Sequence, residues 1–138
     1  MFGINVNYLV VLIAAVASMA VGFLWYSPIL FGKPWLKLMG ISNEQAKGMK
    51  SKANKAYALS FIGALITSYV LAVVLAYMGM SAVADAIQTG FWLWLGFIAP
   101  VMFTSVLFEN KPVKLYCINA GYQLTSLITM AIILTLWA

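Results

Sequence analysis

Four long stretches of this chain contain no charged side chain, and each is long enough to cross a bilayer as a helix. A helix rises 1.5 Å per residue, so about 20 residues cover a hydrocarbon core about 30 Å thick. Inside lipid the backbone amides find no external partners, and an α-helix satisfies all of them within the segment. We therefore predict four membrane-spanning helices, at about residues 6–31, 56–80, 86–108 and 115–137.

The composition supports this interpretation, because folding alone could not hide so much apolar surface from water. Of 138 residues, 64% are hydrophobic and 8% are charged, whereas about a quarter of the residues of an ordinary soluble domain are charged. A chain this short also has a high ratio of surface to volume. We predict an all-α polytopic membrane protein with one domain over residues 1–138, because four spanning helices leave no length for a second folded unit.

The basic residues lie in two of the three connections between the predicted helices. All eight are lysines, six within residues 32–55 and two within residues 109–114. Lysine accumulates in the cytoplasmic loops of membrane proteins, so we expect both connections inside the cell and both termini outside. The chain is therefore predicted to be integral to the cytoplasmic (inner) membrane.

The long first connection has local signals of its own. Pro28 is expected to bend or end the first helix, and residues 35–39 could lie along the membrane interface. Ser42, followed three residues later by Gln45, is typical of a capping box at the start of a short helix. The lysines here are expected to set the topology and to attract anionic lipid, the alternative being a specific ligand site. The expected headgroup contacts are Lys47, Lys50, Lys52 and Lys55.

The two halves of the chain share short similar segments. Residues 63–68 (GALITS) resemble residues 121–126 (GYQLTS), and the two lysine-bearing connections begin alike. A duplication would give two helical hairpins in the same orientation, related by a pseudo-two-fold axis along the membrane normal. Chance similarity is the other interpretation, because apolar segments use few residue types.

Glu109 is the carboxylate that most needs a partner. It is predicted at the C-terminal end of the third spanning helix, where the helix dipole disfavours a negative charge. Lys111 is near in sequence, and Lys33 and Lys37 are expected at the same membrane depth. We predict an interfacial ion pair between Glu109 and these lysines, which would fasten the two connections together, with a functional site as the alternative.

Ionisable groups are missing from the middle of every predicted crossing. Ion-coupled and proton-coupled transporters usually hold such a group there, so a proton relay is not expected. The chain also lacks histidine, and its sequence contains no evident metal-ligand cluster or working pair of carboxylates. We therefore expect a protein that is not an enzyme, with no cofactor, no metal site and no nucleic-acid partner.

A polar stripe on the fourth predicted helix is the main polar feature within the membrane. Its residues recur at spacings of three and four and so share one helix face. They are Asn119, Tyr122, Gln123, Ser126 and Thr129. Because such a stripe is costly against lipid, it either forms hydrogen bonds between helices, at roughly 0.6–2 kcal/mol each, or lines a cavity or pore.

Two further features concern the shape of the bundle. Ala14, Ser18 and Gly22 form a ridge of small residues on the first helix, which allows another helix to approach closely. Pro100 is expected to kink the third helix and to free a carbonyl one turn earlier, which Thr104 or a neighbouring helix could satisfy. We interpret both features as packing.

Several segments together resemble a known family. They are residues 24–35 (LWYSPILFGKPW), 94–97 (WLGF) with Pro100, 108–112 (FENKP) and 119–122 (NAGY). In this order they resemble the bacterial domain-of-unknown-function family 1761, small four-helix membrane proteins without an established activity. The resemblance implies the same topology and adds no reaction. It also implies an acidic residue and a histidine where this chain has Asn119 and Gln123, so the chain keeps hydrogen-bonding groups there without titrating ones.

Three functional classes remain, the third being a membrane enzyme. The first is an oligomeric pore or transporter for a small neutral or hydrophobic solute, lined by the polar stripe. The second is a non-catalytic accessory or lipid-organising subunit that grips anionic lipid through its lysines. We expect a homo-oligomer, because so small a bundle has little room for a pathway of its own, and a larger membrane complex is a second candidate partner.

Overall fold

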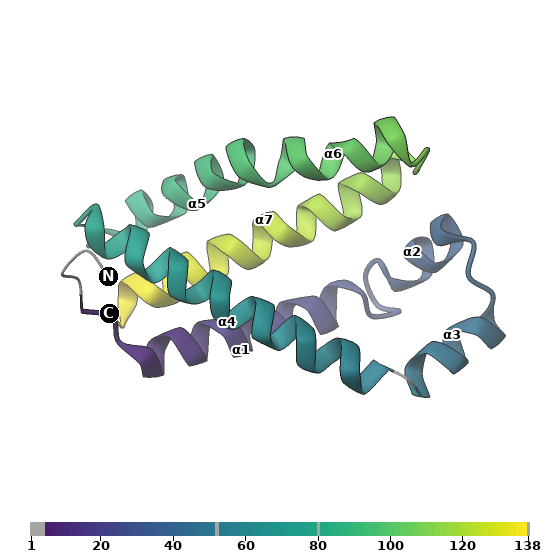
Figure 1. The fold of residues 1–138 in the computed structure, drawn as a ribbon, viewed down its shortest axis with the longest axis horizontal. Coiled ribbons are helices and arrows are strands. Elements are labelled where there is room, and N and C mark those ends of the chain that lie inside the picture. The colour runs from purple at the N-terminus through teal and green to yellow at the C-terminus, as the bar shows by residue number, and fades with distance from the viewer. Residues whose placement is uncertain (1–4, 52, 80, 138) are drawn as a thin grey trace.

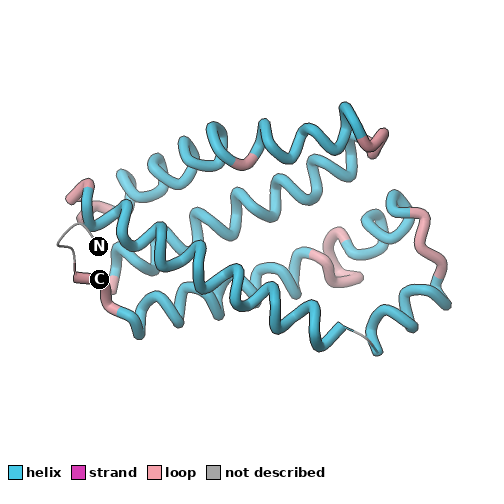
Figure 2. The backbone as a smooth tube through the Cα atoms, viewed as in Figure 1, coloured by secondary structure: helices cyan, strands magenta, loops and turns pink. Residues whose placement is uncertain are grey.

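The computed structural model describes residues 5–51, 53–79 and 81–137, and every regular element in these ranges is an α-helix (Figure 2). Lys52, an expected headgroup contact, and Met80, the predicted end of the second crossing, lie outside the described residues. The helices are α1 (Tyr8–Trp25), α2 (Gly32–Met39), α3 (Asn43–Ser51), α4 (Ala53–Tyr77), α5 (Val83–Phe97), α6 (Ala99–Phe108) and α7 (Val113–Leu136).

Among the described residues, four helical stretches are long and apolar enough to cross a membrane. They are α1, α4, α5 together with α6, and α7, with 18, 25, 26 and 24 residues. At 1.5 Å per residue even the shortest covers about 27 Å, close to the thickness of a hydrocarbon core. For the described residues, the all-helical fold class and four candidate crossings are therefore confirmed.

The first crossing ends at Trp25, six residues before its predicted end, because the chain folds back into a compact turn. The amide of Phe31 donates to the carbonyl of Trp25 (N···O 3.0 Å). Pro28, inside this turn, has no N–H with which to continue the helix. Gly32 closes the turn and is buried; a Cβ there would lie 2.7 Å from the carbonyl oxygen of Ser27 and closer still to the preceding one. Glycine is therefore required at this position.

α7 lies between α1 and the α5–α6 pair, and α4 crosses α7 (Figure 1). α7 packs mainly against α1 and α5 and less extensively against α4 and α6, and α1 in turn packs against α4. α4 makes no comparable backbone contact with α5 or α6. The bundle is therefore open between α4 and the α5–α6 pair.

One end of the bundle carries the start of α1 and the end of α7, near the termini of the described chain, and the other carries the lysine-bearing connections (Figure 1). α2, α3 and the turn between α6 and α7 lie at the second end, whereas the turn between α4 and α5 lies near the termini. This arrangement agrees with alternating crossings. The side of the membrane on which each end lies stays a prediction from the lysines.

The apolar core lies in the half of the bundle near the termini. Its side chains come from the start of α1, the end of α4, the start of α5 and the end of α7. They are Val10, Val11, Ala14, Leu71, Leu75, Ala86, Leu127, Met130, Ala131 and Leu134. In the half near the lysines, Leu115, Ile118 and Ala120 of α7 are buried as well, and polar and aromatic contacts there add to this packing.

The third crossing is broken at Ile98 into α5 and α6. The break is the kink expected at Pro100, whose missing N–H interrupts the helical hydrogen bonds. Thr104 does not satisfy the carbonyl that the proline frees, because its hydroxyl donates to a carbonyl three residues earlier (2.7 Å). A neighbouring helix steadies the break, since the Tyr116 hydroxyl of α7 donates to the carbonyl of Ala99 (2.9 Å).

The two similar segments both contact α1. Ser68 of α4 donates to the carbonyl of Val11 (2.9 Å), and Ser126 of α7 pairs with Ser18 (2.5 Å between hydroxyl oxygens). If the two hairpins were related by a two-fold axis, α4 would contact α5 as extensively as α1 contacts α7. In the described residues, the contact between α4 and α5 is much smaller than that between α1 and α7. The duplication stays a prediction.

The long connection folds into α2 and α3 at the lysine end. α2 ends at Gly40, which has the left-handed conformation (φ +71°) that glycine adopts without strain. α3 begins with a reciprocal capping box. The amide of Ser42 donates to the side-chain oxygen of Gln45 (2.9 Å), and the amide of Gln45 donates to the Ser42 hydroxyl (3.2 Å).

Candidate functional site

Three residues of the polar stripe form hydrogen bonds to α1 and the turn after it. The Tyr26 hydroxyl donates to Asn119 Oδ1 (2.7 Å). The Tyr122 hydroxyl donates to the carbonyl of Ser18 (3.4 Å), and Ser126 pairs with the Ser18 hydroxyl. Tyr26 lies one residue beyond α1, and burial, with a smaller effect of Tyr122, raises its pKa to about 12, so its hydroxyl stays protonated and donates. These contacts fasten α7 to α1.

Small residues on α1 and α7 allow these two helices to pack closely against each other. Ala14 and Ser18 of the predicted ridge are buried. A Cβ on Gly22, the third member, would lie 3.1 Å from the hydroxyl oxygen of Tyr122, so the tyrosine ring rests against the bare backbone. On α7, Gly121 gives the ring of Trp25 the same space. The ridge therefore packs within one copy of the chain.

Two tryptophans hold α7 from different sides. The indole N–H of Trp25 donates to the carbonyl of Ile118, and that of Trp94 on α5 donates to the carbonyl of Ala120, both at 2.9 Å. Sequence reasoning missed both roles. The available signal was the position of Trp94 near the middle of a crossing, where an indole N–H finds no partner in lipid and needs one from the protein.

Gln123 occupies a different environment from these three stripe residues. It lines a cavity of about 340 Å³ over α7, in the opening between α4 and the α5–α6 pair. The lining residues are Thr67, Phe97, Ile98, Val101, Met102, Gln123, Leu127 and Met130. On the floor, Leu127 and Met130 are 5% and 3% exposed, whereas Phe97 and Val101 at the rim are 73% and 64% exposed. The cavity is thus a groove open to the outside of the bundle, hereafter the Gln123 groove.

The polar groups of the Gln123 groove lack hydrogen-bond partners among the described residues. No residue in the described ranges forms a hydrogen bond with the side-chain amide of Gln123 or the hydroxyl of Thr67. Thr125 and Thr129 of α7, by contrast, each donate to a carbonyl of their own helix (2.9 and 2.7 Å). An unsatisfied polar group in the hydrocarbon region costs several kcal/mol. The groove is therefore a place where a hydrogen-bonding occupant is favoured.

A comparison with known protein families covers all the segments that form the contacts of α7 and the Gln123 groove. A family profile described as "Protein of unknown function (DUF1761)" matches residues 9–135. The chain belongs to this family. The resemblance noted in the sequence is therefore confirmed, and it covers the turn after α1, the break at Pro100 and the stripe of α7. No curated protein and no solved structure matches the chain.

In this DUF1761 protein Glu109 is exposed at the end of α6. Asn110 follows in the left-handed conformation (φ +55°), and the amide of Lys111 turns back to a carbonyl of α6 (3.1 Å). Within the described ranges no lysine lies at ion-pair distance from Glu109, so the structure does not bring it together with Lys33, Lys37 or Lys111. At an exposed site water solvates both charges, and an ion pair gains little.

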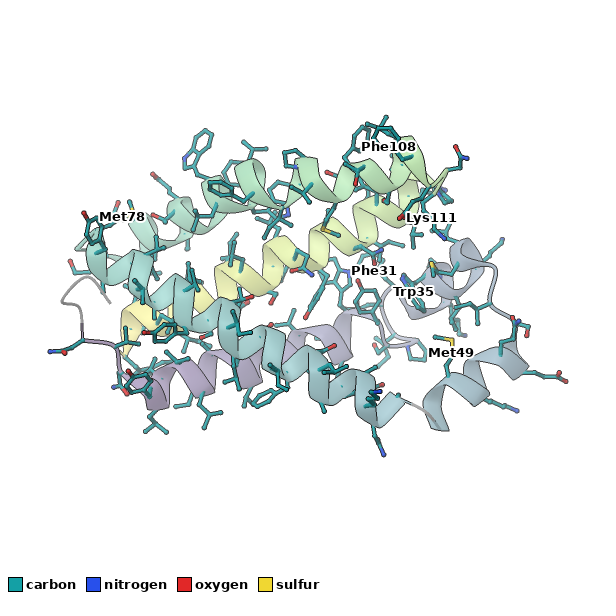
Figure 3. All side chains as sticks on the ribbon, viewed as in Figure 1. Phe31, Trp35, Met49, Met78, Phe108 and Lys111 are labelled. Carbon is teal, nitrogen blue, oxygen red and sulfur yellow. The ribbon has the colours of Figure 1, made fainter. Side chains whose placement is uncertain are left out.

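The lysines expected at lipid headgroups lie at one end of this DUF1761 protein. Lys47 and Lys55 are exposed, whereas Lys52 and the side chain of Lys50 lie outside what is described. Lys111 lies at the same end of the bundle as α2 (Figure 3). In the described part of the chain, no three side chains among histidine, cysteine, aspartate and glutamate gather where they could hold a metal ion.

Proposed function

We propose that this membrane protein binds a small neutral or hydrophobic solute in the Gln123 groove and passes it across the bilayer. The observation that carries the proposal is the Gln123 amide, which lies in a largely apolar groove of a membrane-spanning helix without a partner in the described protein. A bound solute supplies the hydrogen bond and fills the apolar walls at the same time. The volume of about 340 Å³ is at the lower end of the range of ligand pockets.

The lining of the groove favours a neutral solute. None of the eight lining residues is charged. Along α7 the nearest charged residue is Lys114, nine residues before Gln123, or about 13 Å at 1.5 Å per residue. A charged solute would lack a counter-charge, and a charge at the centre of a bilayer costs at least about 2.5 kcal/mol.

In this proposal the protein lies in the cytoplasmic membrane, with α2, α3 and the α6–α7 turn inside and both termini outside. The lysines of these connections support this orientation through the positive-inside rule. Assembly into a homo-oligomer stays a prediction. The stripe residues that form hydrogen bonds to α1 and its turn serve packing. The solute path is formed by Gln123 and Thr67.

Solute flux into proteoliposomes tests the proposal. Glycerol and acetamide serve as small neutral probes, and vesicles without protein give the background rate. We expect flux above background for the natural protein and a loss of roughly tenfold in Gln123→Leu, because one hydrogen bond is removed from the groove. Gln88→Leu is the matched control, since Gln88 is exposed on α5 and outside the groove. Equal flux in natural protein and Gln123→Leu contradicts the proposal.

A second candidate function is that of a lipid-organising subunit, and the distribution of lysines and apolar residues around α2 favours it. This helix follows the turn after the first crossing and places Lys33 and Lys37 in exposed positions, whereas Trp35, Leu36 and Leu38 are half-buried. Figure 3 shows Trp35 on the side of α2 that faces the bundle. A helix of this kind suits the headgroup region, where each lysine gains about 1 kcal/mol from anionic lipid.

Lipid retention tests this second function. After delipidation, native mass spectrometry compares the binding of phosphatidylglycerol, which is anionic, with that of zwitterionic phosphatidylcholine. We expect a preference for phosphatidylglycerol that falls when Lys33 and Lys37 are both changed to glutamine. An equal loss from changing Lys47 and Lys55 would assign the preference to overall charge rather than to α2.

A further inference from the structure

We propose that the occupant of the Gln123 groove enters sideways from the lipid and is a neutral amphiphile with an apolar body and one carbonyl or hydroxyl group. This inference rests on the proposed function, because it names the solute class and the direction of access for the same site. Three properties of the groove carry it: where the groove opens, how deep in the membrane it lies, and which hydrogen-bonding groups it presents.

The groove opens toward the surface that lipid covers. Its rim residues Phe97 and Val101 are mostly exposed, and Thr67 on the facing helix is exposed as well. Its floor on α7 is closed, since Leu127 and Met130 are almost fully buried. Lateral access therefore needs no movement of α1 or α7, whereas access through the centre of the bundle would break the packing of the floor.

The groove lies far from both ends of the crossing. Gln123 is ten residues after the start of α7 and thirteen before its end, or about 15 and 20 Å along the helix axis. Thr67 is similarly central in α4, fourteen residues after its start and ten before its end. Water is scarce at this depth, so a molecule already dissolved in the hydrocarbon reaches the groove more readily than one from solution.

The hydrogen-bonding groups of the groove define the polar part of the ligand. The amide of Gln123 offers two donors and one acceptor, and the hydroxyl of Thr67 offers one donor and accepts as well. A carbonyl accepts from these donors, and a hydroxyl can donate to the amide oxygen. A plain alkane fits the apolar walls but leaves both groups without a partner, and a carboxylate brings a charge that nothing in the lining neutralises.

The volume limits the part of the ligand that is enclosed. At about 30 Å³ per water-sized group, the groove of about 340 Å³ holds roughly eleven such groups. This suits the polar group and a short length of chain or ring, and the remainder of a longer molecule would extend through the opening into the surrounding lipid.

Photolabelling in vesicles tests the inference. A fatty ketone that carries a diazirine is activated in bilayers containing the full-length protein, and the labelled residues are mapped by mass spectrometry. Three competitors of equal carbon number are compared at equal membrane concentration: methyl nonyl ketone, undecane and undecanoate. We expect labels at groove residues of α4, α5, α6 and α7, with competition by the ketone at least tenfold stronger than by the other two.

The variants separate a specific hydrogen bond from apolar partitioning. In Gln123→Leu, the ratio of competition by the ketone to competition by undecane should fall to about one. In Gln88→Leu, this ratio should stay unchanged. Equal competition by ketone and alkane overturns the inference, as does a groove that stays unlabelled because a second copy covers it or water fills it. If glycerol flux still depends on Gln123 in either case, the proposed function stands without the inference. Specific labelling without any solute flux would support the binding site and overturn the proposal that the protein transports the solute.

Discussion

Replacing Gly32 by alanine should destabilise the protein severely, because the turn after α1 has no room for a Cβ. The added carbon would lie 2.7 Å from the carbonyl oxygen of Ser27, whereas an ordinary van der Waals contact begins near 3.4 Å. At least 0.7 Å of backbone movement is needed to relieve this overlap, and the nearer carbonyl of Tyr26 requires more.

The cost follows from what the turn holds in place. Overpacking of this kind typically costs about 1–3 kcal/mol. A shift of the turn also strains the bond from Tyr26 to Asn119 (2.7 Å), which is worth roughly 1 kcal/mol in a membrane protein. We therefore expect Gly32→Ala to lower the free energy of unfolding by about 2–4 kcal/mol.

Unfolding by sodium dodecyl sulfate in mixed micelles, followed by circular dichroism, measures this loss. Gly63→Ala is the matched control, because a Cβ on Gly63 of α4 meets nothing within 4 Å. The control should be neutral or up to about 1 kcal/mol more stable, as alanine is the better helix former. A Gly32→Ala protein within about 0.5 kcal/mol of the natural one would refute the steric reasoning.

Two further predictions concern the contacts that hold α7, and the same unfolding assay measures them. Ser126→Ala leaves the buried Ser18 hydroxyl without its partner and should cost roughly 0.6–2 kcal/mol, whereas Thr129→Val removes a bond within one helix and should cost less than about 0.5 kcal/mol. Trp94→Phe removes the indole bond to α7 and should cost about 1–3 kcal/mol, and Trp92→Phe, at a residue 63% exposed, should be close to neutral. Equal losses within either pair would contradict the assigned contacts.

The crossings could be predicted from the sequence because a helix that spans lipid needs a minimum length and excludes charged residues. Both properties can be read directly from the sequence. The break at Pro100 and the capping box at Ser42 and Gln45 were equally accessible, since each depends on residues that are near in sequence. The end of α1 was predicted only in part, because Pro28 was expected to bend or end the helix but the crossing was predicted to continue to residue 31. It depends on how Phe31 and Gly32 fold back onto the helix end, which hydropathy does not register.

The site was only partly predictable, because helical spacing tells which residues share a face and not what lies opposite. Asn119, Tyr122 and Gln123 are neighbours in the stripe, yet the first two bond to residues of α1 and its turn, and Gln123 lines a groove. That difference depends on α4 packing against α1 and leaving α5 and α6 uncovered. The pairing of Glu109 was equally undetermined, because an exposed carboxylate is stable in water without a lysine.

Spin-label accessibility at position 123 tests the open groove most directly. Cys117 is the single cysteine of the chain, so Gln123→Cys is labelled in a Cys117→Ser background. Val101→Cys marks the exposed rim and Leu127→Cys the buried floor. The account predicts that the label at 123 collides readily with oxygen, which is lipid-soluble, and little with a water-soluble nickel chelate, as at the rim. Low accessibility to both, as expected at the floor, or high accessibility to the chelate, as in a water-filled pore, would contradict it.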